Sequence, residues 1–206
     1  MKVSAVCAAL AALALALAAP PAPTARAADL DPAAVQVQRF DAALIETMKA
    51  GSSLGPTGRA HKLAPTIEQT FDIPAMIRFA VGPAWAGMSD ADHAALADAF
   101  ERYTVASYAH NFDSYSGEKI SVDPDVDTRG LDKIVKTTLV SGGGSTTAIA
   151  YRMRDTTGPW KIIDVYYQGT ISQLTTSRSD FASTLASGGA KALVAHLDAQ
   201  TAKLLK

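Results

Sequence analysis

The stretch from Gly158 to Phe181, GPWKIIDVYYQGTISQLTTSRSDF, places a strand, a hinge and a helix in one short run. Residues 160–167 are rich in aromatic and β-branched side chains, which suit a pleated, half-buried surface. Gly169 ends this predicted strand, because glycine tolerates backbone angles that other residues avoid. Residues 170–173 then have the form of a capping box, so we expect a helix to begin there. This pattern predicts a sheet whose last strand leads directly into a helix.

A change of periodicity after Gly117 predicts the rest of the sheet. The four predicted strands span residues 118–126, 131–140, 145–154 and 160–167. Pro124 interrupts the first of them, so that strand is expected at an edge of the sheet. The glycines at 142–144 indicate a hairpin loop rather than a phosphate cradle, because no Gly-Lys-Ser/Thr follows them. The short connections predict an antiparallel meander.

Capping signals and helical spacing predict helices before and after these strands in the sequence. Asp31 and Pro32 open the first helix, and Gly51 is expected to end it. Ser89, answered by Asp92, caps the longest helix. The predicted helices span residues 32–50, 59–70, 71–81, 90–112, 171–186 and 190–205, with a bend at Pro65. The expected class is α+β, with about four strands packed against N-terminal and C-terminal helices around an apolar pocket.

Residues 1–27 have the features of a secretory signal peptide, with Lys2, an Ala/Leu core and an A-x-A motif before Ala28. An uncleaved anchor is the alternative, but the apolar run is short for a span of about 20 residues. The rest, 28–206, is expected to be one soluble periplasmic domain without stable membrane insertion. Without Lys2 and Arg26 the net charge falls from −1 to −3, which argues against nucleic acid and against permanent adhesion to anionic lipid.

The sequence contains none of the motifs or residue spacings that are typical of a catalytic or metal site. The histidines at 61, 93, 110 and 196 have no spacing typical of a metal site, and the mature segment has no cysteine. No G-x-S-x-G elbow is present. We therefore predict no catalytic residue, no metal and no cofactor, and we do not expect an enzyme.

An apolar arc on the helix at 90–112 is wider than one packing stripe requires. Either this helix is buried on two sides, or one side of it faces a cavity. Alternate residues of the predicted strands would form the sheet face that is directed toward this helix. The candidate pocket lining is Tyr103, Tyr108, Phe112, Val135, Leu139, Ile149, Tyr151, Met153, Ile163 and Val165.

Asp164 is a charge within an otherwise apolar strand, where it is costly unless it is paired or hydrogen-bonded. One interpretation is contact with a ligand headgroup, a role in which Arg178 is a second candidate. The other is structural, with bonds to backbone amides or to a basic partner such as Arg178 or Arg152. The sequence leaves both open.

Several motifs carry a resemblance to a known family. They are WKIIDVY at 160–166 followed by Gly169, Ser172, Arg178, Phe181 and Gly189, with FDIP at 71–74, GPAW at 82–85 and Phe100-x2-Tyr103-x4-Tyr108. Together they resemble the MlaC-like family of periplasmic lipid carriers, also called toluene-tolerance proteins or auxiliary components of ABC transporters. Within that family, the residues of these motifs are more similar to those of the hopanoid-biosynthesis-associated HpnM subgroup.

The resemblance implies a soluble carrier that exchanges phospholipid or a hopanoid-type lipid with transient membrane-transporter partners. Composition alone supports equally an adaptor domain with a filled core. An enzyme on a cone-shaped α+β fold is a third hypothesis, but nothing at readable spacing pairs with Asp164 to perform acid–base chemistry.

Overall fold

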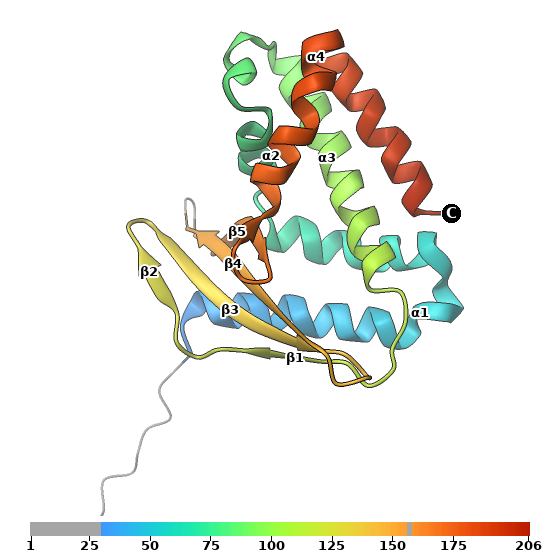
Figure 1. Cartoon of the computed structure of the whole chain (residues 1–206), viewed down its shortest axis with the longest axis vertical. Helices are drawn as coiled ribbons and strands as arrows, with labels where there is room; N and C mark the ends of the chain where they lie inside the picture. The colour runs from blue at the N-terminus through green and yellow to red at the C-terminus, as the bar shows by residue number, and fades with distance from the viewer. Residues whose placement is uncertain (1–29, 156–157) are drawn as a thin grey trace, which may run out of the picture.

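The structure, a computed structural model, describes residues 30–155 and 158–206, so the predicted signal peptide lies outside it. The helices are α1 (Pro32–Thr70), α2 (Ile73–Val81), the 3-10 helix η1 (Gly82–Gly87), α3 (Asp90–Asn111) and α4 (Gln173–Leu204). The strands are β1 (Lys119–Val122), β2 (Asp127–Arg129), β3 (Asp132–Val140), β4 (Thr146–Arg154), β5 (Lys161–Tyr167) and β6 (Ile171–Ser172). The α+β class and the antiparallel sheet flanked by N-terminal and C-terminal helices are confirmed (Figure 1).

The sheet has six strands rather than about four, in the order β1-β3-β4-β5-β6, with β2 also paired to β3. The first predicted strand, 118–126, is observed only as β1, which ends before Pro124, and β2 begins beyond the predicted range. Proline has no amide hydrogen for the ladder, which accounts for a break at this point. Both β1 and β2 pair antiparallel with β3, and β1 has no other partner among the described strands, so the expected place of the first strand at a sheet edge is confirmed.

The register of the central strands sets which side chains share a face. Thr137 of β3 pairs with Ile149 of β4, and Leu139 pairs with Thr147. A bulge follows on β5, because Asp164 pairs with Arg152 while Ile162 pairs with Met153. Ile163 is therefore the extra residue and leaves the regular alternation of the strand.

The first helix does not end at Gly51 as predicted, and the helix predicted at 59–70 is its second arm. The chain breaks instead at Gly55, which has a φ of 63°. A side chain at Gly51 would lie 2.1 Å from the Asp113 carbonyl oxygen, so this glycine serves a close packing contact. The second arm returns beside the first, and the Lys62 ammonium donates to the Glu46 carbonyl over 3.1 Å (Figure 1).

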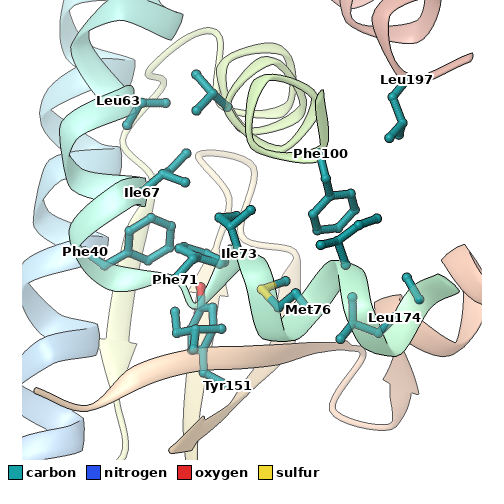
Figure 2. Close-up of a cluster of buried hydrophobic side chains, with 14 of the residues drawn as sticks. Phe40, Leu63, Ile67, Phe71, Ile73, Met76, Phe100, Tyr151, Leu174 and Leu197 are labelled. Atoms are coloured by element: carbon teal, nitrogen blue, oxygen red, sulfur yellow. The ribbon is translucent and has the colours of Figure 1, made fainter. Parts of the chain in front are cut away.

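Aromatic side chains join these two arms to the sheet. The Phe40 ring meets those of Phe71 and Tyr151 edge-on, at centroid distances of 5.2 and 6.0 Å. Figure 2 shows Tyr151 standing on the sheet with its hydroxyl pointing toward Phe40 and Phe71. A bridge between Phe71 and Ile162 then fixes the end of α1 against β5. This cluster is the apolar centre on which α3 rests.

The C-terminal helix begins and bends near the expected residues. Its N-cap is Ser172 rather than Thr170, since the Ser172 hydroxyl accepts from the Thr175 amide. The predicted interruption at Gly188–Gly189 is confirmed by non-helical angles at both residues. Within the described residues, no helix is both long and apolar enough to span a bilayer.

Candidate functional site

A cavity of about 790 Å³ lies between α3, the inner face of the sheet and the start of α4. Ligand pockets in proteins typically measure about 300–1,000 Å³ and are lined mostly by apolar and aromatic groups. The cavity is in the upper part of that range. Its size and its lining make it the candidate functional site.

The wide arc of α3 supplies one wall of the cavity. Tyr103 and Ser107 are one helical turn apart, and Tyr108 and Phe112 repeat that spacing on an adjacent row. The Tyr108 and Phe112 rings stack with centroids 5.8 Å apart and planes at 12°. Of the two interpretations of this arc, the geometry favours a helix with one side facing a cavity.

The sheet supplies the opposite wall. Ile149 and Tyr151 alternate along β4, and Val165 pairs with Tyr151 on β5. Leu139 of β3 and Tyr167 of β5 extend the same face. The sequence-predicted residues that lie in the cavity wall are Tyr103, Tyr108, Phe112, Leu139, Ile149, Tyr151 and Val165.

Three of the predicted lining residues lie elsewhere. Val135 and Met153 are fully buried in the solid core, because side chains of the helices cover that part of the inner face. Ile163 lies at a separate small hollow beside Asp72 and Phe79. It does so because the bulge shifts it out of the alternation that would have placed it beside Val165.

The closed part of the cavity includes residues that the sequence did not single out as lining. Met48, Met76 and Leu174 belong to three different helices, and all three are buried. Phe71 and Phe100, which appeared only as motif residues, complete this apolar wall. Each lies on the apolar stripe of its own element, so the pattern predicted burial but could not indicate which buried residues border empty space.

Polar residues surround the open part of the cavity. They come from the end of α3 and the following loop, the β3–β4 hairpin and the first turns of α4: Asn111, Asp113, Ser114, Glu118, Ser141, Thr147, Gln173 and Ser177. We call this set the mouth. Two close approaches hold it in place, since a side chain at Gly142 would lie 2.2 Å from the Ser116 carbonyl oxygen and Gly51 meets Asp113 as described. These contacts pack the loop after α3 against α1 and against the β3–β4 hairpin.

Behind the cavity wall lies a buried carboxylate that sequence reasoning missed. Asp41 of α1 is 4% exposed, and neither of its oxygens has a hydrogen-bond partner among the described residues. Burial raises its pKa to about 7, and the nearby Tyr151 hydroxyl offsets part of that rise. The signal was present in the sequence, because Asp41 falls within the stripe formed by Val37, Leu44 and Met48.

Asp164 lies outside the cavity wall, and its hydrogen bonds favour the structural interpretation. Its carboxylate accepts from the Ser172 hydroxyl at 2.6 Å, from the Val165 amide at 2.8 Å and from the Leu174 amide at 3.2 Å. These bonds join the end of β5 to the start of α4. The basic partners proposed from sequence are engaged elsewhere, since Arg152 pairs with Asp132.

Arg178 also lies away from the cavity. Its guanidinium donates to the Phe79 carbonyl oxygen at 2.9 Å and stacks 4.3 Å above the Phe79 ring. Gly82 has a φ of 68°, which favours glycine, and a side chain there would also lie 3.1 Å from the Arg178 guanidinium. Arg178 thus fastens α4 to the end of α2.

Within the part of the chain described, no group of three or more His, Cys, Asp or Glu residues could hold a metal ion.

Comparison with known proteins extends these observations. Residues 38–199 match the profile of the family described as MlaC protein. A solved structure of a phospholipid-binding protein from Ralstonia solanacearum, in complex with a phospholipid, has a similar fold with a TM-score of 0.71. The two sequences are 22% identical, and the match covers 84% of this chain and 99% of the other. No curated protein sequence matches this chain significantly.

Proposed function

The chain belongs to the MlaC family, and on that premise we propose that it is a non-catalytic carrier that binds a lipid in the cavity. The observation that supports this most is the cavity itself, about 790 Å³ with an apolar interior and a polar mouth. An amphiphile places its apolar part against such a wall and its polar part at such a rim. The similar fold of a protein solved with a phospholipid adds support.

The residues proposed to contact the apolar part of the lipid are those of the two facing walls. Tyr103, Tyr108 and Phe112 line one side. The other side is lined by Leu139, Ile149, Tyr151 and Val165. Aromatic rings supply large apolar area with little side-chain entropy to lose, which favours binding of an extended chain or a rigid ring system. Both phospholipid and hopanoid-type lipid offer such a body.

The proposal includes export and exchange. Signal-peptide features at 1–27 support secretion to the periplasm and a mature chain starting at Ala28. Membership of the family supports a role in transient transfer of lipid between membrane complexes. The resemblance of the sequence motifs to the HpnM subgroup supports a hopanoid-related system. N-terminal sequencing of the secreted protein should give Ala28 within one or two residues, and an intact Met1 on membrane-bound protein would refute cleavage.

The competing function is an adaptor domain without a ligand, and lipid extraction with one pair of variants separates the two. Carrier protein purified without detergent should release lipid detectable by mass spectrometry. Ile149→Trp should reduce that load, because the indole fills space on the cavity side of β4. Ala148→Trp is the matched control, since the neighbouring residue points to the opposite, exposed face of the same strand.

The melting temperature of the lipid-free protein is measured on the same samples. A carrier should keep most of its stability in Ile149→Trp while it loses lipid. A large fall in melting temperature with an unchanged lipid load would show that Ile149 is ordinary core. A lipid-free extract of the wild-type protein would favour the adaptor.

A further inference from the structure

The charge of the mouth restricts the kind of lipid that the cavity can take. Among the described residues that line the cavity there is no Lys, Arg or His, whereas Asp113 and Glu118 contribute two carboxylates. Glu118 accepts from the Ser116 amide, and such backbone hydrogen bonds hold its pKa below its usual range. This carboxylate is therefore ionised at neutral pH, and the mouth is negative.

Two cations close to the loop after α3, Arg59 and Lys49, are used for structural contacts. Arg59 is buried and donates to the carbonyl oxygens of Ala109 and Gly51, at 2.8 and 3.2 Å. Lys49 pairs with Glu46 at 3.0 Å. Neither side chain lines the cavity, so neither neutralises a ligand there.

The N-terminus of α4 is a further potential source of positive charge at the mouth, because helix amides attract anions. The second and third amides of this helix are already satisfied by the protein. The Leu174 amide donates to Asp164 at 3.2 Å, and the Thr175 amide donates to the Ser172 hydroxyl at 3.0 Å. Asp164 also brings a negative charge to this helix end, which further reduces its attraction for a phosphate.

We propose that the carrier selects lipids whose polar end has no net negative charge, that is, hydroxyl-bearing or amine-bearing lipids. This inference rests on the proposed lipid-carrier function. A phosphate monoanion at the mouth would give up water beside two carboxylates, with no cation among the described lining residues to compensate, which is unfavourable. Hydroxyl and amine groups instead find acceptors and donors in Asn111, Ser141 and Gln173.

The test compares three ligands that share one oleoyl-type chain and differ in their polar end: monoolein (uncharged), oleylamine (cationic) and oleoyl lysophosphatidylglycerol (anionic). Each is titrated below its aggregation concentration against lipid-free protein loaded with the uncharged fluorophore N-phenylnaphthylamine. We expect monoolein and oleylamine to displace the fluorophore at roughly tenfold lower concentration than the anionic lipid. Two like charges close together are unfavourable even in water, and more so at a partly buried rim.

A charge-reversal variant tests whether the mouth causes this preference. Asp113→Lys should improve the affinity for the anionic lipid relative to monoolein by roughly fivefold or more. The Asp113 side chain bonds only to the neighbouring Ser114 hydroxyl among the described residues, and Asp113→Asn provides a milder change in the same direction. Asp98→Lys is the control, because Asp98 is an exposed residue of α3 that lies about 20 Å along the helix axis from the Asn111 end, after which Asp113 follows.

The outcomes separate the inference from the function on which it rests. Equal affinities for the three lipids, or a ratio that Asp113→Lys and Asp98→Lys change alike, would overturn the charge selection while the carrier function stands. Failure of every lipid to displace the fluorophore would overturn the carrier function itself. A shifted ratio in Asp113→Lys alone, with a smaller shift in Asp113→Asn, supports the inference.

Discussion

Replacing Asp41 with asparagine should stabilise the protein above neutral pH and remove most of the pH dependence that this residue contributes. The folded pKa of Asp41 is about 7 because the carboxylate is buried, against an ordinary value of 3.8. Between these values the folded state holds a proton that the unfolded state releases. Stability is therefore greatest below about pH 4 for this group and is lost as the pH rises through about 7.

The size of this effect follows from the shift in pKa. A shift of about three units corresponds to about 4 kcal/mol of destabilisation once the group is fully ionised. Between about pH 5.5 and 8, where most other carboxylates no longer titrate, about 2 kcal/mol of that loss should be observed. The amide in the Asp41→Asn variant cannot ionise, so the free energy of unfolding of this variant should lack this component, although the buried amide adds a cost that does not depend on pH.

Urea unfolding of both proteins across this pH range measures the difference in slope. The comparison cancels the histidines, which titrate in both proteins. Asp98→Asn makes the same chemical change at an exposed site and should follow the wild type. If the profiles of wild type and Asp41→Asn are parallel, the carboxylate has found a partner such as the Tyr151 hydroxyl or water, and the reasoning from burial fails.

Three further predictions use the same unfolding assay. Asp164→Ala should cost about 2–4 kcal/mol because it leaves the buried Leu174 amide unpaired, whereas an unchanged stability would mean that the carboxylate is dispensable. Gly142→Val should destabilise the rim by more than about 1 kcal/mol, because its side chain meets the Ser116 carbonyl oxygen, and Gly143→Val should be tolerated better. Burial would raise the pKa of Asp132, but its bonds to Arg154 and Arg152 outweigh this and lower it, so wild type should lose more stability than Asp132→Asn on acidification below about pH 4, and equal losses would contradict this.

Local signals in the sequence were sufficient to predict several elements. Asp31 and Ser89 cap their helices as expected, since a capping hydroxyl or carboxylate acts on amides only two or three residues away. The hairpin around Gly144 likewise closes on itself, with the Gly144 amide donating to the Ser141 carbonyl at 2.9 Å. In these cases the partners that decide the structure are neighbours in the chain.

Other features depended on partners far away in sequence. Gly51 and Gly55 carry the same local signal, yet the chain continues as helix through the first, where the Asp113 backbone packs closely, and breaks at the second. The bulge that displaces Ile163 depends on how β4 and β5 align. The cavity wall could be predicted in part because strand alternation and helical spacing are local, whereas the boundary between filled core and empty space depends on tertiary packing.

The bridge from Phe71 to Ile162 has a consequence for the order in which the protein assembles. The junction between α1 and α2 gains its partner on the sheet only when β5 is in place, and the Asp72 amide donates to the Ile162 carbonyl at the same point. Contacts between residues so distant in sequence slow folding, because a long loop must close before they contribute. A chain delivered N-terminus first would thus hold its early helices incomplete until most of it has emerged, a period in which a holding chaperone would have most to protect.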